Sequence, residues 1–284
     1  MTAATDPLIR TEDLVPLLRS VTLLDVRYRL GGPGGPAEFE SGHLPGARYV
    51  DLDTALAAAP GAGGRHPLPD PAVFGAAMRA AGVHHDRPVV VYDDWAAHAA
   101  ARCWWLLRHH GHDDVRVLDG GLAAWRAAGG PLETGPAGAG TGEEPGDFVP
   151  GPGRAPVARS EDLPAAVASG RVLLDARAPE RFRGEVEPVD PVAGHIPGAV
   201  NAPTAANLAP DGRFHEPADL RARFEALGVA PAVPGVEAIA SCGSGVTACH
   251  DLLALAHAGL GDHALHPDSW SGWITDPARP IARG

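Results

Sequence analysis

The chain has 284 residues, an apolar share of 45% and a formal net charge of −12 at neutral pH. This length is about twice that of a common single domain and allows two well-buried cores. The negative charge disfavours nucleic acid as a partner, because a phosphate backbone would be repelled. With no apolar run near the roughly eighteen residues of a membrane span, and no basic and apolar signal-peptide regions in MTAATDPLIRTEDL, we expect no membrane partner and a cytoplasmic protein.

Three cysteines are few for this length, and their number is odd. A disulfide framework is therefore not expected, which leaves room for a working thiol among Cys103, Cys242 and Cys249. The sequence offers no compact set of Cys and His ligands. We expect neither a metal nor an organic cofactor.

The sequence is internally duplicated, and four segments recur in the same order at offsets close to 150 residues. Such agreement predicts two copies of one fold. The matching pairs are LLDVR at 23–27 with LLDAR at 173–177, SGHLPGARYVDL at 41–52 with AGHIPGAVNAPT at 193–204, PVVVYD ending at Asp93 with VEAIASC ending at Cys242, and LDGGLAAW at 118–125 with HPDSWSGW at 266–273.

A Gly- and Pro-rich stretch without periodicity lies between the copies. It is typical of a linker, or of a long surface loop. The predicted organisation is a non-catalytic domain at 1–133, a linker at 134–153 and a catalytic domain at 154–284.

Within the first copy, short apolar runs alternate with helical patterns. This order predicts parallel βαβ units and an open sheet flanked by helices, with ligands beyond the carboxyl ends of the strands. In chain order the segments are VTLLDV, PAVFGAAMRAAG, RPVVVYD, HAAARCWWLLRHHG and VRVLDG. In the second copy the strand VEAIA leads into a loop and a helix at SCGSGVTACHDLLALAHAG.

Cys242 begins the loop CGSGVT, in which Gly243 and Gly245 allow the backbone to curl tightly. Inward N–H groups and the following helix would stabilise a thiolate, which makes Cys242 the candidate nucleophile. A buried structural cysteine would not need such a loop, whereas Cys103 and Cys249 fit core positions. Because the first copy has Asp93 at the matching position, we expect it to act as a scaffold and as one wall of a cleft between the domains.

Together the GH(I/L)PGA turns, the repeated LLDxR strands, the CGSGVTA loop and the terminal DSWSGW resemble the tandem-domain rhodanese family over nearly the whole chain. Within it, thiosulfate sulfurtransferases carry basic residues after the cysteine, and CGSGVTA is similar to the 3-mercaptopyruvate group. The resemblance implies a sulfurtransferase that takes sulfur from a small anionic donor, 3-mercaptopyruvate, and holds it as a persulfide on Cys242. The acceptor would be a thiol, cyanide or a thioredoxin-like protein.

The resemblance also implies roles for individual residues. Arg181 would pair with the donor carboxylate, Arg177 would support it in a more structural position, and Ser244 would hydrogen-bond the sulfur or the substrate carbonyl. Asp53 and His66, from the first copy, would complete a Cys–Ser–His/Asp relay. The substrate-binding loop would also comprise Gly243, Gly245, Val246 and Thr247.

For several of these side chains a structural or surface role without function stays open. Asp53 fits a helix cap, His66 an ordinary loop residue, and the charges of RAPERFRGE a solvated face. His43 and His195 occur in both copies although only one has a nucleophile, which indicates a role in turn structure.

Two departures from the family pattern bear on the donor. Val189 stands where a second substrate arginine is expected after Glu187-Pro188, and His98 replaces a tyrosine. Thiosulfate:cyanide sulfurtransferase therefore remains an alternative, and so does a non-catalytic persulfide carrier, which an intact Cys242 does not exclude. A Cys-based phosphatase is more distant, because CGSGVTAC has no phosphate-binding arginine.

Overall fold

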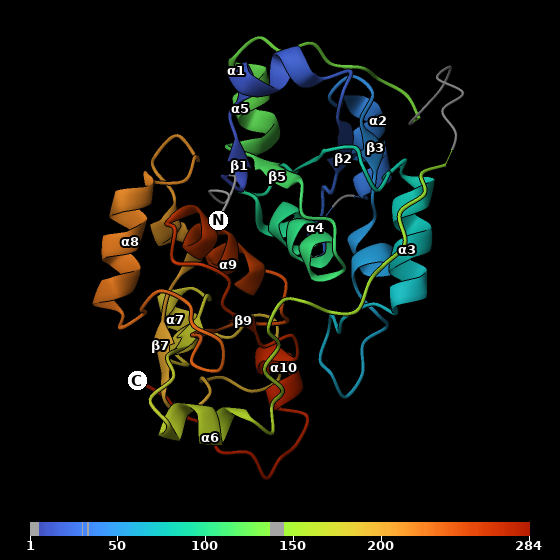
Figure 1. Ribbon diagram of the computed structural model, residues 1–284. Coiled ribbons are helices and arrows are strands. Elements are labelled where there is room, and N and C mark those ends of the chain that lie inside the picture. The colour runs from blue at the N-terminus through green and yellow to red at the C-terminus, as the bar shows by residue number, and fades with distance from the viewer. Residues whose placement is uncertain (1–5, 30, 33, 137–144) are drawn as a thin grey trace. The chain divides into compact units, whose positions relative to one another are not determined.

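The computed structural model describes residues 6–29, 31–32, 34–136 and 145–284, which form two compact units (Figure 1). Unit 1 consists of the described residues up to Ala58, those of Pro69–Arg154, and Asp211–Arg213. Unit 2 consists of Ala59–Leu68, Ala155–Pro210 and Phe214–Gly284. The segment Ala59–Leu68 therefore belongs to the second unit, although the duplication assigns it to the first copy.

Unit 1 is built on a parallel sheet of five strands in the order β1-β5-β4-β2-β3. The neighbouring strands β2 and β4 are buried along their whole length, as expected for the apolar run VVVY in a parallel sheet covered on both faces. The predicted open parallel architecture is thus confirmed. The strands are β1 (Leu8–Ile9), β2 (Thr22–Asp25), β3 (Arg48–Tyr49), β4 (Val89–Tyr92) and β5 (Val115–Leu118).

Helices flank this sheet, and α4 packs on β4 and β5. The start of α3 shows how the sequence sets a boundary, because the Asp70 carboxylate accepts the N–H of Ala72 and Pro71 occupies the first helical position. The helical elements are α1 (Thr11–Leu14), η1 (Val15–Leu17), α2 (Gly35–Ser41), the π-helical turn η2 (Leu52–Leu56), α3 (Pro71–Ala80), α4 (His98–His109) and α5 (Gly121–Ala127).

Unit 2 repeats the design with a four-stranded parallel sheet in the order β7-β6-β8-β9, on which α9 packs against β8 and β9. Within the described ranges, no helix combines the length and hydropathy needed to cross a membrane. The strands are β6 (Leu173–Asp175), β7 (Ala199–Asn201), β8 (Ile239–Ser241) and β9 (Ala264–Leu265). The helical elements are α6 (Leu163–Ala168), α7 (Pro179–Phe182), η3 (Thr204–Asn207), α8 (Pro217–Ala226), α9 (Ala248–His257) and α10 (Ser269–Trp273).

The segment predicted as a linker, 134–153, is partly described; its residues 137–144 lie outside the described ranges. The part that follows packs on unit 1. Gly146 N–H donates to Arg79 O at 2.8 Å, and the buried Phe148 meets Phe74 edge-on. Residues 145–153 therefore belong to unit 1, and Phe148 adds to its buried interior.

Both copies contain the same buried ion pair at the end of the LLDxR strand, which is β2 in unit 1 and β6 in unit 2. Arg27 holds the Asp25 carboxylate at 2.7 Å, and Arg177 holds that of Asp175 at 2.6 Å. Each guanidinium also donates to a glycine carbonyl of the GHxPG turn. Since the pair recurs in the copy that has Asp93 where the other has Cys242, it belongs to the fold.

The histidines of the GHxPG turns are also structural in their geometry. His43 stacks on Phe39 with ring centroids 3.7 Å apart, and His195 stacks on Phe182 at 3.8 Å. The Nδ1 atom of each histidine lies 2.8 Å from the carbonyl oxygen of the same phenylalanine. This arrangement agrees with their predicted role in turn structure.

In unit 1 the loop after β4 closes around the carboxylate of Asp93. Four N–H groups, those of Trp95, Ala97, Ala99 and Ala100, donate to its two oxygens at 2.9 Å. Ala97 adopts φ +64 to make this possible. Burial raises the pKa of Asp93 to about 6 against the opposing effect of these N–H groups, so the carboxylate is ionised at neutral pH.

Asp93→Ala should therefore destabilise unit 1. Each buried N–H left without an acceptor costs about 1–3 kcal/mol, so we expect a loss of about 3 kcal/mol or more at neutral pH, visible as a lowered transition in scanning calorimetry. The matched control is Asp94→Ala, which removes an ion pair with the partly exposed Arg29 and should cost less than about 1 kcal/mol. Equal effects of the two substitutions would contradict the anchoring role of Asp93.

Candidate functional site

Cys242 lies directly after β8, where the loop turns toward α9. Its Sγ accepts N–H groups from Ser244 at 3.4 Å and Gly245 at 3.1 Å. Gly245 has φ +80, and a Cβ there would lie 2.3 Å from Pro267 O, so only glycine fits. The loop thus has the curled form and the inward N–H groups expected from CGSGVT, and an anionic sulfur would be stabilised in it.

The other two cysteines occupy core positions. Cys103 is buried in α4, and burial raises the pKa of its thiol. Cys249 is buried in α9, and its Sγ lies 3.5 Å from Gly245 O as a donor, which requires the protonated thiol. Both geometries agree with the prediction that these residues serve packing.

The segment Ser269–Ser271 of α10 runs beside the cysteine loop and fixes its backbone. Trp270 N–H donates to Cys242 O at 2.9 Å, and Ser271 N–H donates to Gly243 O at 2.9 Å. In the opposite direction, Cys242 N–H donates to Ser269 Oγ at 3.0 Å. The C-terminal motif DSWSGW therefore holds the candidate nucleophile in place.

His66 and Ser244 are brought together although 178 residues separate them in sequence. His66 Nδ1 and Ser244 Oγ form a buried hydrogen bond of 2.8 Å. His66 lies in Ala59–Leu68 and so belongs to unit 2 itself. Asp53, by contrast, is a residue of η2 in unit 1, where burial and the nearby Asp51 raise its pKa.

Arg181, on α7, is held by two carboxylates. Its Nη2 donates to Glu187 Oε1 at 2.6 Å and to Asp190 Oδ2 at 3.2 Å. Burial opposes the ionisation of Glu187, but the hydrogen bonds from Arg181 and from the N–H groups of Asp190 and Val189 outweigh it and lower its pKa. Val189 itself is 39% exposed, and its contribution here is this backbone N–H, which donates to Glu187 Oε1 at 3.1 Å.

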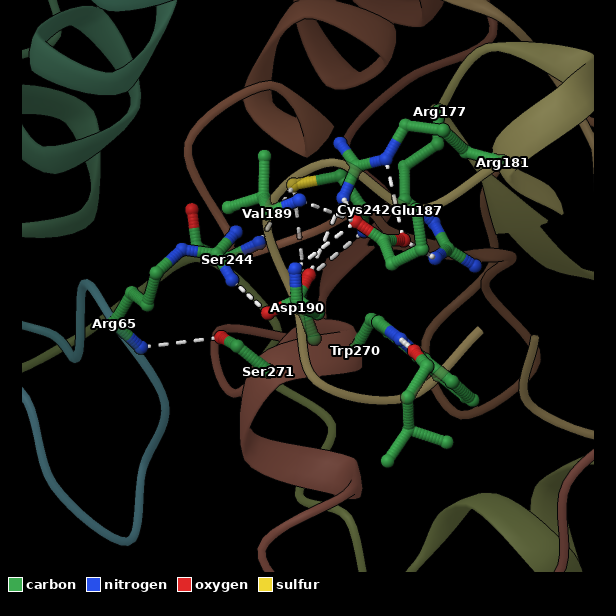
Figure 2. Close-up of polar contacts among 12 residues, drawn as sticks. Arg65, Arg177, Arg181, Glu187, Val189, Asp190, Cys242, Ser244, Trp270 and Ser271 are labelled. Carbon is green, nitrogen blue, oxygen red and sulfur yellow. Dashed lines mark hydrogen bonds and ion pairs between the residues drawn. The ribbon is translucent and has the colours of Figure 1, made fainter. Parts of the chain in front are cut away.

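Arg65 is a site residue that the sequence analysis did not identify. Its Nη1 donates to Asp190 Oδ1, so Asp190 bridges Arg65 and Arg181, and Figure 2 shows it between them. Burial raises the pKa of Asp190 despite these two cations. The Arg65 backbone N–H donates to Ser271 Oγ at 3.1 Å. Only its position beside His66 in GGRHP could have pointed to it.

Both guanidinium groups lie over the cysteine loop at Gly243. A Cβ on Gly243 would lie 3.0 Å from Arg65 Nη2 and 3.7 Å from Arg181 Nη2. The missing side chain therefore lets two positive charges approach the residue next to Cys242. An anion placed there would meet two planar donors beside the sulfur of Cys242, the candidate nucleophile.

Arg177 has a different environment from Arg181. It is buried, its Nε and Nη2 bind Asp175, and its guanidinium lies over the ring of Trp270 at 5.0 Å. Burial works against its charge, but the hydrogen bonds it donates to Asp175 and the negative charges of Asp175, Glu187 and Cys242 raise its pKa. Its geometry is that of a buried support.

The remaining candidates lie as follows. Val246 is buried, and its carbonyl accepts Cys249 N–H at 3.1 Å. Thr247 immediately precedes α9, and its carbonyl accepts His250 N–H. Both form the transition from loop to helix. His98 begins α4 in unit 1, where burial lowers its pKa to about 4 and its Nδ1 lies 2.7 Å from Trp95 O.

Comparisons with known proteins fit this arrangement. The family model of the rhodanese-like domain matches residues 11–128 and 160–276. A Pseudomonas aeruginosa protein provisionally named a 3-mercaptopyruvate sulfurtransferase is 49% identical over 267 residues, which cover 92% of each chain. A Mycobacterium tuberculosis protein provisionally named a thiosulfate sulfurtransferase is 46% identical over 100% of this chain and 99% of its own.

A solved structure extends the likeness to three dimensions. The 3-mercaptopyruvate sulfurtransferase of Leishmania major superposes with a TM-score of 0.84 at 28% identity, covering 97% of this chain and 77% of that one. The residues that the family model matches include strands β2 to β9, the Cys242 loop and the DSWSGW segment. The chain therefore belongs to the rhodanese family and carries two rhodanese-like domains in tandem.

Proposed function

We propose that this protein is a sulfurtransferase that takes sulfur from 3-mercaptopyruvate and carries it as a persulfide on Cys242. The outer sulfur then passes to a thiol, cyanide or a thioredoxin-like acceptor. The observation that carries the proposal is the pair of guanidinium groups, Arg65 and Arg181, next to the nucleophile at Gly243. A second arginine thus compensates for Val189, where the family pattern leads one to expect a substrate arginine.

The two arginines suit a donor with a carboxylate. A planar guanidinium binds a carboxylate through two parallel N–H groups, and the donor carboxylate would take over donors that now serve Asp190 and Glu187. The cysteine loop itself has no charged side chain between Cys242 and Cys249. The positive charge at the loop therefore comes from Arg65 and Arg181, beside Gly243, and could hold a carboxylate that is separate from the reacting sulfur.

The chemistry proceeds in two half-reactions. In the first, the Cys242 thiolate attacks the donor sulfur, the donor C–S bond breaks, and its electron pair passes to the carbon that becomes the methyl group of pyruvate after protonation. In the second, an acceptor nucleophile attacks the outer sulfur and the Cys242 thiolate leaves. This is ping-pong catalysis with a covalent intermediate. Ser244 and His66 form a hydrogen-bonded pair suited to moving the proton.

Thiosulfate is the second candidate donor, favoured by the name of the Mycobacterium tuberculosis relative and by its ability to use the same two arginines. A persulfide carrier without turnover is the third. Steady-state assays with both donors separate the first two, and sulfide release beyond one equivalent per chain excludes the carrier. Val189→Arg would strengthen the preference for the keto acid if its carboxylate reaches this edge of the site.

Cys242→Ser should abolish turnover and also the mass increase of one sulfur atom after incubation with donor. Cys103→Ala and Cys249→Ala should retain both, because neither sulfur lies in the anion-stabilising loop. Intact-protein mass spectrometry beside a sulfide-release assay measures the two properties. Turnover by Cys242→Ser would rule out the proposed intermediate.

Arg65→Ala and Arg181→Ala should each lower kcat/KM for 3-mercaptopyruvate by about tenfold to a hundredfold, since a charge-assisted hydrogen bond contributes about 1.5–3 kcal/mol. The control is Arg183→Ala, whose guanidinium pairs with the exposed Glu185, and it should leave kcat/KM unchanged. A wild type that prefers thiosulfate, with Arg65→Ala neutral for the keto acid, would instead establish the alternative donor.

His66→Ala should lower kcat by about a hundredfold or more, the usual contribution of general acid–base catalysis, with KM changed little. Asp53→Asn tests the last member of the relay implied by the resemblance, and a comparable fall in kcat is expected. Steady-state kinetics across pH 6–9 provide the measurement. If His66→Ala retains wild-type kcat, the proton must move through water or the donor itself.

A further inference from the structure

Ser269 has a backbone conformation that serine seldom adopts. It is fully buried at the start of α10, and its φ is +51. Residues other than glycine, asparagine and aspartate mostly avoid this left-handed region because Cβ comes too close to the backbone. Such strain persists where the surrounding structure imposes it, and it often marks a functional position.

The duplicated fold supplies an internal comparison. Gly121 occupies the same place in unit 1, with φ +55, beside Asp93 in the position of the nucleophile. A Cβ on Gly121 would lie 2.4 Å from Asp93 O, so that copy admits only glycine. The matching backbone bonds are kept, with Leu122 N–H donating to Asp93 O and Trp270 N–H to Cys242 O, both at 2.9 Å. The copy with the nucleophile therefore has serine in a conformation for which glycine is the easy choice.

The Ser269 hydroxyl accounts for this choice through its contacts. Its Oγ accepts Cys242 N–H at 3.0 Å and lies 2.9 Å from His266 O. The same oxygen lies 3.8 Å from Cys242 Sγ. One hydroxyl therefore faces both the backbone and the sulfur of the nucleophile, and its single proton can turn toward His266 O or toward Sγ.

We propose that Ser269 is a positioning residue for Cys242, fixing the cysteine backbone and supplying a third hydrogen bond to the sulfur when it is anionic. In the thiol form the hydroxyl donates to His266 O. In the thiolate form it rotates to Sγ and joins the N–H groups of Ser244 and Gly245. This inference rests on the proposed function in one respect, that Cys242 is the nucleophile.

Two substitutions separate the hydroxyl from the backbone strain. Ser269→Gly removes the hydroxyl and relieves the strain, as in the first copy, whereas Ser269→Ala removes the hydroxyl and keeps the strain. Both proteins should show the same chemical defect, with Ser269→Gly the more thermally stable of the two. If Ser269 had only a structural role, the chemical defect would instead be smaller in the more stable variant, Ser269→Gly.

The readouts are the pH profile of iodoacetamide alkylation at Cys242, followed by peptide mass spectrometry, and single-turnover persulfide formation from 3-mercaptopyruvate. In both variants the alkylation midpoint should move to higher pH. Persulfide formation near neutral pH should slow by about 5- to 15-fold, which corresponds to one lost hydrogen bond, while the donor concentration for half-maximal rate stays within about twofold.

The outcomes are distinguishable. Wild-type midpoints and rates in both variants, beside a reactive wild-type Cys242, would overturn the role of Ser269 and leave the proposed function intact. A defect in Ser269→Ala alone would assign the effect to strain and would also overturn it. If wild-type Cys242 alkylates no faster than Cys103 and Cys249, the proposed function fails as well.

Discussion

Backbone N–H groups at the carboxyl end of the central strand must find an acceptor once they are buried, and both halves of the chain are organised around that need. In unit 1 the Asp93 carboxylate takes four of them and fills the loop permanently. In unit 2 the single sulfur atom of Cys242 accepts two such N–H groups. The same backbone demand is thus met by a closed structural anchor in one copy and by the candidate nucleophile in the other.

Charge in the candidate site is balanced before any ligand arrives. Arg65 and Arg181 share Asp190, and Arg181 also pairs with Glu187, so no guanidinium of this group is left to water alone. A donor carboxylate that binds here would exchange one anion for another instead of neutralising bare cations. Such exchange keeps the net gain in affinity modest, because desolvation offsets much of the attraction, and it lets an anionic product leave.

The features that could be predicted from the sequence are those that short local motifs determine. Repeated LLDxR strands, GHxPG turns and the glycines around Cys242 impose particular backbone shapes, and the parallel sheets and the curled loop follow from them. Arg65 escaped prediction because its partner Asp190 lies 125 residues away and no local pattern marks the pair. The role of Ser269 was not predicted because it depends on a positive φ, and the residues of DSWSGW do not indicate that backbone angle. Long-range pairing and backbone strain are properties of the folded chain.

The membership of Ala59–Leu68 in unit 2 has a consequence for how the protein is made. This segment leaves a ribosome early, yet Arg65 and His66 find their partners 206 and 178 residues later, at Ser271 and Ser244. During synthesis unit 1 can fold with this loop still unengaged, since domains fold as units from the N-terminus. Unit 2 is completed only when β9 and α10 emerge, so an unfinished chain holds a folded unit 1 without the finished surroundings of Cys242.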